Sequence, residues 1–238
     1  MWIIADYEAT TLFSLKPATA TVSGGKTLLV PTPFAIKMAL LDVVCRLEGQ
    51  ASGERIWDRW LAGLRVALRP AEAVVVNHTV IKLLKPRRHP ARPGTQHAGY
   101  FQQTISYREY AQLVGSLGIA LEADQDAETG RLAQWLLRIN YLGKRGSFFQ
   151  LQAAPRASEA LPAGFIVVSR DMDTMSLDAL LTQLDDVGEG LTFARANIYS
   201  PLGIRVGKQR ALRQVALPYR LVSSSRGYSY YRLVRETG

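Results

Sequence analysis

Two of the three histidines lie in one strongly basic segment, where they could do chemistry at neutral pH. His89 and His97 stand within residues 82–108, among several arginines, and His78 precedes that segment. Because imidazole titrates near neutral pH, such a histidine could act as a general acid or base in metal-free cleavage of RNA. A histidine in a solvated loop is usually only solvated, so we assign no catalytic residue and keep RNA cleavage as an alternative.

The same segment has the composition of a phosphate-binding finger. Its prolines exclude a regular helix, and its tip has almost no apolar residues with which to build a core. The flanking residues 65–84 and 100–107 are rich in strand-forming residues. We therefore expect an extended β-hairpin with a mobile basic tip that follows phosphates and inserts between bases or subunits. The segment holds no acidic residue and six basic ones: Lys82, Lys85, Arg87, Arg88, Arg92 and Arg108.

A basic turn at residues 141–147 is a second candidate contact. Its two glycines allow backbone amides to approach a phosphate, and Lys144 and Arg145 between them supply positive charge. An ordinary helix C-cap with solvated basic residues fits the same pattern equally well. Tyrosines near the C-terminus could likewise stack on bases or pack within a sheet: Tyr228, Tyr230 and Tyr231.

Two other motifs do not support nucleotide or metal binding. Residues 24–27 read GGKT, but Ala20 stands where a P-loop requires its first glycine. Asp171, Asp173 and Asp178 lie close in sequence, near an expected strand end and helix start, where carboxylates are favoured by the helix dipole. We expect no metal and no cofactor.

The single cysteine, Cys45, excludes a disulfide framework within the chain and fits a small core residue better than a nucleophile. The first residues include an acid at Asp6 and lack the basic and apolar regions of a signal peptide. No apolar run approaches the ~18 residues of a membrane span. We expect a soluble, cytoplasmic protein that has no contact with a membrane.

The charge of the chain is unevenly distributed. The 238 residues are 47% hydrophobic and 21% charged, which supports a buried core, and they carry a net charge of +9. Residues 195–238 hold nine basic residues and one acid, whereas residues 121–191 hold eleven acids and six bases. Such concentration of positive charge favours a polyanionic partner, nucleic acid first.

The first two thirds of the chain predict alternating strands and helices. Pro33 and Gly49 bracket an apolar helix over residues 34–47, with Phe34, Met38, Leu41 and Cys45 on one face. A short helix over residues 54–64 is expected to pack beside it with Trp57 and Trp60. Strands are expected at 2–15, within 65–84, at 100–107, 116–123 and 148–151, and a helix at 128–141. The order βαββαβ over residues 1–152 predicts an α+β, ferredoxin-like domain.

Residues 153–238 are expected to form a smaller, β-rich C-terminal part packed on that domain. It begins with a strand at 165–169. A helix follows, with Ser176 as N-cap and leucines at helical spacing: Leu177, Leu180, Leu181 and Leu184. The last segment reads as a series of arginine-rich strands.

Several of these features together resemble the CRISPR-associated RAMP proteins. They are the Pro31-Thr32-Pro33 helix start, the strand and helix order, the long basic hairpin, and the Leu-Gly-Lys-Arg-Gly-Ser turn of residues 142–147. Within that family, these features resemble the Cascade subunit that holds the 5′ handle of the guide RNA. In some relatives this turn continues into Cys-Pro, whereas here it continues into Ser147-Phe148.

The resemblance implies an RRM-like fold with a thumb at about residues 80–104 that contacts guide RNA and the neighbouring backbone subunit. Other implied partners are the large subunit and target DNA nearby in the complex. Some relatives cleave the precursor with a Tyr and a Lys-His pair, and this chain has no adjacent Lys-His pair. The residues expected to bind RNA are Lys26, Lys37, Lys85, Arg87, Arg88, His89, Arg92, Arg108, Lys144 and Arg145.

Three hypotheses follow. The first is a non-catalytic subunit of a type I CRISPR effector that binds the guide RNA, caps the backbone filament and serves RNA-guided antiviral defence. The second is a metal-independent endoribonuclease that uses His89 or His97 to process the guide precursor. The third is a basic module whose thumb docks only protein partners.

Overall fold

Antiparallel strands and a few helices make up the structure, a computed structural model that describes residues 1–20, 25–95, 98–124, 126–144, 146–171, 178–197 and 199–234. The first sheet has the order β6-β1-β5-β2-β8, and β7 also pairs with β1. In the middle of this sheet, Ala120 of β5 lies between Ile4 of β1 and Ala67 of β2. The strands are β1 (Trp2–Ala9), β2 (Val66–Arg69), β5 (Leu117–Glu122), β6 (Phe149–Leu151), β7 (Arg156–Ser158) and β8 (Ile166–Val167).

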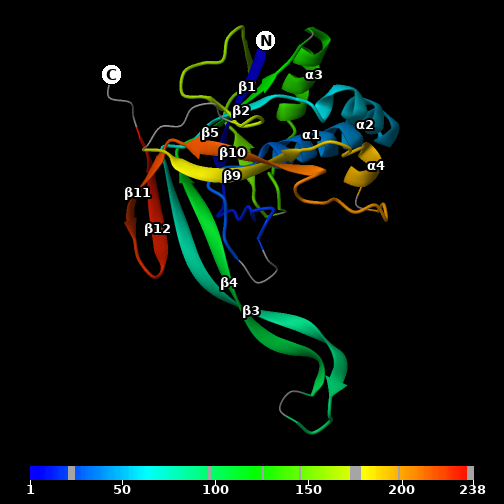
Figure 1. The fold of residues 1–238 in the computed structure, drawn as a ribbon, viewed down its shortest axis with the longest axis vertical. Helices are drawn as coiled ribbons and strands as arrows, with labels where there is room; N and C mark the ends of the chain where they lie inside the picture. Colours follow the sequence, from blue (N-terminus) through cyan, green and yellow to red (C-terminus); the bar gives the residue numbers. More distant parts are fainter. Residues whose placement is uncertain are drawn as a thin grey trace.

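Helices pack beside this sheet (Figure 1). Helix α1 (Pro33–Glu48) begins where Thr32 accepts a hydrogen bond from the Ala35 amide at 3.1 Å, and it ends at Gly49, whose φ is 84°. The helix predicted at 34–47 is thus confirmed, but its fully buried face is formed by Ile36, Leu40, Val43 and Val44. The other helices are α2 (Gln50–Ile56), the π-helical turn η1 (Trp57–Leu61), α3 (Asp126–Leu136) and α4 (Phe193–Ala196).

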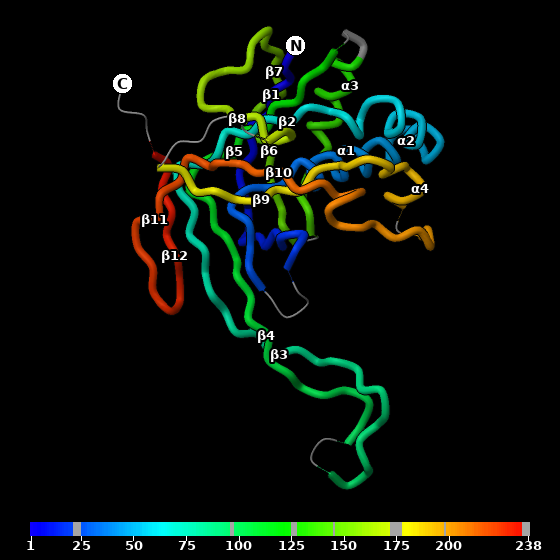
Figure 2. The backbone as a smooth tube through the Cα atoms, viewed as in Figure 1, coloured from blue at the N-terminus to red at the C-terminus, as the bar shows by residue number. Residues whose placement is uncertain are grey.

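A second sheet has the order β11-β12-β3-β4 and carries a long projection. Strands β3 (Ala73–Ala91) and β4 (Gly99–Val114) pair with each other, whereas β12 (Tyr228–Leu233) covers β3 only from Ala73 to Asn77. The rest of the hairpin therefore extends away from the body (Figures 1 and 2). The edge strand is β11 (Tyr219–Ser224). A separate two-stranded sheet pairs β9 (Leu180–Val187) with β10 (Arg210–Leu217).

Two sequence predictions need correction. Leu180, Leu181 and Leu184 lie in strand β9, not in a helix, because the segment pairs with β10 along eight residues. The expected N-cap, Ser176, and Leu177 lie outside the described residues. Helix α3 ends at Leu136, although the predicted apolar residues Leu132, Trp135, Leu136 and Ile139 are all buried.

The C-terminal part is built into the same structure as the first 152 residues. Strand β12 pairs with β3, β8 with β2, and β7 with β1. Leu184, Val215 and Leu217 belong to the same buried cluster as Ile36 and Leu40 of α1. The division at residue 152 stays a prediction.

Candidate nucleic-acid interface

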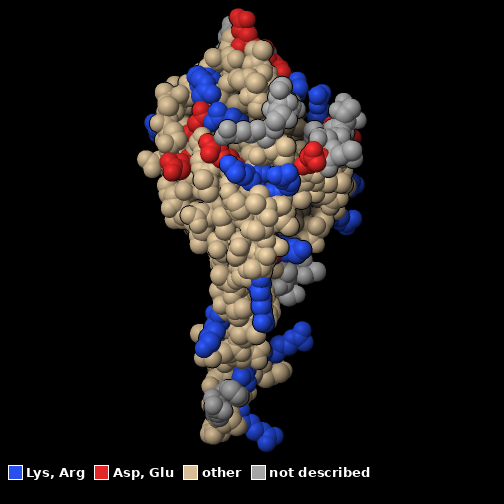
Figure 3. All heavy atoms as spheres, turned by 90° about the vertical axis from the view of Figure 1, so that its left-hand side faces the viewer, with Lys and Arg blue, Asp and Glu red and all other residues tan. Residues whose placement is uncertain are grey.

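The projecting hairpin carries most of the predicted RNA-binding residues. Lys85, Arg88, His89 and Arg92 are exposed, and Arg87 is half-buried. Within the described part of the chain none of these five forms an ion pair, in contrast to arginines of the body such as Arg69 and Arg156, which both bind Asp6. Figure 3 shows Lys and Arg side chains along the projection. The positive charge of the hairpin is therefore available to an external anion.

The hairpin has two different sides, because cross-strand partners point to the same side of a ribbon. One side pairs Val80 with Tyr107 and Pro86 with Phe101. It is mainly apolar although exposed, since Val80, Leu84, Phe101, Ile105 and Tyr107 are 58–67% exposed, and Lys82 lies opposite Ile105 on the same side. The other side pairs Thr79 with Arg108 and Lys85 with Gln102. The projection thus offers one mainly apolar side that also carries Lys82, and one more polar side that carries Lys85 and Arg108.

The base of the hairpin is held by the segment that carries Lys26. The Glu109 amide donates to the Gly25 carbonyl at 2.7 Å, and the Glu109 carboxylate accepts from the Thr27 amide at 2.9 Å. These bonds leave Lys26 exposed beside the strand that bears Arg108. Gly25 is required there, because a Cβ atom would lie 1.9 Å from the Tyr107 carbonyl oxygen.

The basic turn lies against the same part of the chain. Gly143 packs on Leu15, to whose Cδ2 a Cβ would be 2.5 Å, and the Leu15 amide donates to Thr27 Oγ1 at 2.9 Å. Lys144 is exposed in this turn, and Arg145 lies outside the described residues. The turn is closed by a bond from the Leu142 amide to the Ser147 carbonyl at 3.2 Å, so it is a loop before β6 and not a helix C-cap. Lys26, Arg108 and Lys144 thus lie on segments that contact one another: the Thr27 segment bonds to β4 and to Leu15, and Leu15 packs on the turn that holds Lys144.

Lys37 does not reach the surface, which corrects its prediction as an RNA contact. Its side chain is 2% exposed and donates to Asp186 Oδ1 at 2.7 Å and to the Ala62 carbonyl at 2.9 Å. Burial lowers the pKa of the Lys37 amine and raises the pKa of the Asp186 carboxyl, and each charge opposes the shift of the other. This lysine holds α1 to β9 and is not available to RNA.

The side of the first sheet that carries Trp2 and Ile4 is covered by other residues of the chain. Trp2, Ile4 and Ala120 form a buried cluster there, against which Leu161 and Phe165 pack. In RRM domains, single-stranded RNA stacks on exposed aromatic residues of a four-stranded sheet. That mode requires the covering segment to leave, so the hairpin and its base are the better interface.

The residues considered for catalysis or metal binding form no site in the described ranges. His89 is exposed, His97 lies outside those ranges, and the His78 Nε2 is 3.8 Å from Glu109 Oε1. Asp171 accepts from the Gln214 amide at 2.9 Å, and Asp173 is not among the described residues. No group of three His, Cys, Asp or Glu that could hold a metal ion occurs in the described residues. The same residues contain no helix long and apolar enough to cross a membrane.

Pairing in β11 and β12 reveals a feature that the sequence prediction missed. Arg220 lies directly opposite Arg232, and both are exposed. The sequence does contain a signal for this pairing. The two arginines are placed symmetrically about the turn at Ser225 to Gly227, so a hairpin centred on that turn would bring them opposite each other. The predicted tyrosines divide between the two sides of this sheet: Tyr231 packs against the core, whereas Tyr228 lies with Tyr230 on the outer side.

Comparison with known proteins finds a relative that aligns with most of the chain. The sequence is 21% identical over 204 residues to CRISPR-associated protein Cas5 of Archaeoglobus fulgidus, covering 84% of this chain and 85% of that protein. No family model matches the chain. The expected resemblance to a CRISPR-associated protein is confirmed by this alignment.

Solved structures with a similar path include a chain of a CRISPR RNA-guided surveillance complex. It has a TM-score of 0.44 and 13% identity, covering 98% of this chain and 89% of that one. A CRISPR protein from Archaeoglobus fulgidus has a TM-score of 0.39 and 10% identity, covering 99% of this chain and 92% of that one.

Proposed function

We propose, from the likeness to a CRISPR-associated protein, that the chain is a non-catalytic subunit of a type I CRISPR effector. It grips the 5′ handle of the guide RNA and caps the backbone filament in RNA-guided antiviral defence. The observation that carries this proposal is the projecting hairpin, whose basic residues from Lys82 to Arg92 have no acidic partner among the described residues. The backbone and large subunits are the protein partners, with target DNA nearby.

The sheet order supports a ferredoxin-like core for this function. Strands β6-β1-β5-β2 follow one another as the fourth, first, third and second strands of a βαββαβ unit, with all neighbours antiparallel. In this arrangement the hairpin is an insertion between the second and third strands of the unit. A division into residues 1–152 and 153–238 belongs to the same proposal.

The proposed RNA interface has two parts. The hairpin supplies Lys85, Arg87, Arg88, His89 and Arg92. The base supplies Lys26 and Arg108, together with the turn that holds Lys144 and Arg145. Phosphate contacts of this kind fix the position of the RNA on the protein but do not depend on its sequence. We therefore expect the bases of the handle to be recognised by a few additional contacts to base edges.

Binding of a labelled, repeat-derived RNA at several salt concentrations tests this proposal. If about six phosphates are neutralised, log K against log salt should have a slope of about −4, and R87Q/R88Q/R92Q should reduce that slope by about 2. The control R55Q/R59Q/R138Q removes the same charge from the body and should leave the slope unchanged. A wild-type slope near zero would contradict the proposal. Site-specific cleavage in the presence of a chelator would favour the endoribonuclease alternative.

A further inference from the structure

The outer side of the second sheet carries arginines and tyrosines that the hairpin interface does not use. Register places Arg220, Arg232 and Ala73 in one row across β11, β12 and β3. Side chains alternate along a strand, so Tyr230 and Tyr228 follow Arg232 on the same side. The opposite side faces the core, where Val74, Val76, Ala111 and Tyr219 are buried.

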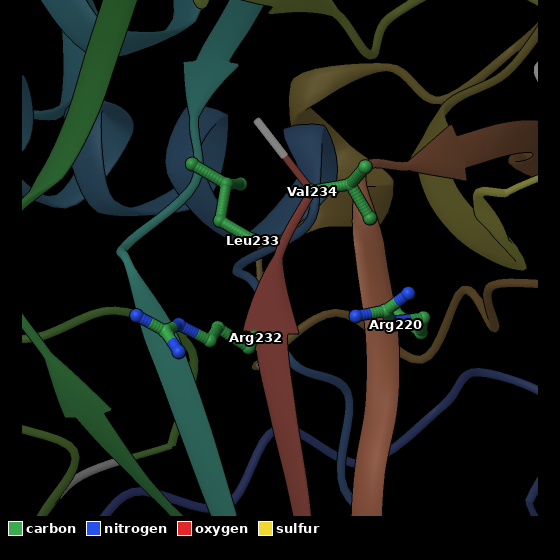
Figure 4. Close-up of a pocket in the computed structure, with 4 residues that line it drawn as sticks. All are labelled: Arg220, Arg232, Leu233 and Val234. Carbon is green, nitrogen blue, oxygen red and sulfur yellow. The ribbon is translucent and has the colours of Figure 1, made fainter. Parts of the chain in front are cut away.

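The two facing arginines have no acidic partner within the described part of the chain. Like charges directly opposite in a sheet are destabilising, so this row costs stability unless an anion is bound. A cavity of ≈ 330 Å³ lies beside them, lined by Arg220, Arg232, Leu233 and Val234. Figure 4 shows Arg232 reaching toward β3 while Arg220 stays over β11. The two guanidinium groups point in different directions, so they can contact two separate phosphates of one strand.

Aromatic rings and the polar side of the hairpin continue this surface. Tyr228 is 39% exposed and Tyr230 is half-buried. Tyr228 lies opposite Asn77, which lies opposite Tyr110, and Arg108 follows on the same side of β4. Positive charge that follows a backbone, combined with rings on which bases stack, is the pattern of proteins that bind single strands without sequence preference.

We propose that the outer side of this sheet, with Arg220, Arg232, Tyr228 and Tyr230, binds single-stranded RNA as a second site. The bound strand crosses β12 toward Arg108 and contacts the sheet through phosphates and stacked bases. This proposal rests on the proposed function, because the strand is taken to continue from the RNA held by the hairpin. It adds a contact that reads no sequence and lies away from the hairpin tip.

The test measures binding of the full chain to fluorescent twelve-nucleotide oligouridine and oligothymidine. R220Q/R232Q should weaken oligouridine binding by about 10- to 30-fold at 0.1 M salt and reduce the salt slope by about 1.4. Y228A/Y230A should weaken it at least about fivefold through lost stacking. The control R55Q/R59Q removes the same charge from α2 and η1, and its affinity should equal the wild type.

Three outcomes would overturn the proposal. The first is equal affinity of R220Q/R232Q and R55Q/R59Q for oligouridine. The second is loss of oligothymidine binding alone, which would assign the face to DNA. The third is crosslinking of 4-thiouridine oligomers without any product in residues 227–232. The hairpin variant R87Q/R88Q/R92Q keeps the two proposals apart, because its failure to weaken handle binding would contradict the function while leaving these results in place.

Discussion

At the scale of single residues, the pair of Lys37 and Asp186 is a buried ion pair that joins helix α1 to strand β9. Its 2.7 Å bond is shielded from water, since the side chains are 2% and 4% exposed. The Lys37 amine also donates to the Ala62 carbonyl, and the Asp186 carboxylate also accepts from the Val187 amide. Removing one partner would leave an uncompensated charge in the interior.

We therefore expect K37M to lower the free energy of unfolding by about 3–5 kcal/mol. In K37M/D186L the remaining charge is absent, so most of that loss should be recovered. Urea unfolding measures both values. D42A, which breaks the exposed pair with Arg46, should change stability by less than about 1 kcal/mol. Equal losses in K37M and D42A would contradict the burial of Lys37.

Gly25 gives a second prediction at this scale. In G25A the new methyl group meets the Tyr107 carbonyl, so the segment must move from β4 and its bond to the Glu109 amide is lost. We expect destabilisation by about 1–3 kcal/mol and faster hydrogen exchange of the Glu109 amide. G130A, in an exposed turn of α3 with open space around it, should instead stabilise by up to about 1 kcal/mol. A G25A protein with unchanged exchange would contradict this contact.

These residues show where sequence information ends. The exposure of Lys85, Arg88 and Arg92 could be predicted, because no apolar residues accompany them. The burial of Lys37 could not be predicted, because its partner is 149 residues away in the sequence and a lysine in a helix normally faces solvent. Opposed arginines such as Arg220 and Arg232 become visible only when the strand register is known.

At the scale of elements, β9 was the clearest error of sequence interpretation. Leucines at three- and four-residue spacing indicate a helix, yet pairing with β10 overrides that pattern, because a strand here can bury Leu184 and present Asp186 to Lys37. Helix α1 was predictable, since Thr32, Pro33 and Gly49 mark its ends independently of the rest of the fold.

Strand β9 can be tested by comparing two leucines. Leu184 is buried, whereas Leu181 is 56% exposed. L184A should cost about 2–5 kcal/mol and L181A less than about 0.5 kcal/mol. In an amphipathic helix the two residues would share one face, so similar losses in thermal or urea unfolding would contradict the strand.

At the scale of the whole molecule, pairings across residue 152 join the two parts. Truncation to residues 1–152 would expose β3 along its edge to β12 and uncover Ile36 and Leu40 next to the missing Leu184. We expect this fragment to lack a cooperative unfolding transition by circular dichroism and to associate in solution. A monomeric fragment that unfolds cooperatively would establish the first part as an independent domain.

The mixture of strands and helices over residues 1–152 was visible in the sequence because each element carries its own periodicity. The pairings of β7, β8 and β12 were not, because they join segments far apart in the chain and depend on which edges the first strands leave free. For the same reason, the covered side of the first sheet could not be foreseen from Phe165 alone.

The buried bond between Lys37 and Asp186 also has a consequence in time. A ribosome produces α1 well before it produces β9, so the nascent helix carries a cation in its future interior with no counter-charge to meet it. The same holds for the Trp57 indole, which donates to the Leu191 carbonyl, and for the Ala71 carbonyl, which accepts from the Tyr219 hydroxyl: each early group is made long before its partner. The first half of the chain therefore stays incomplete during translation, and its core closes only when the last third has been synthesised.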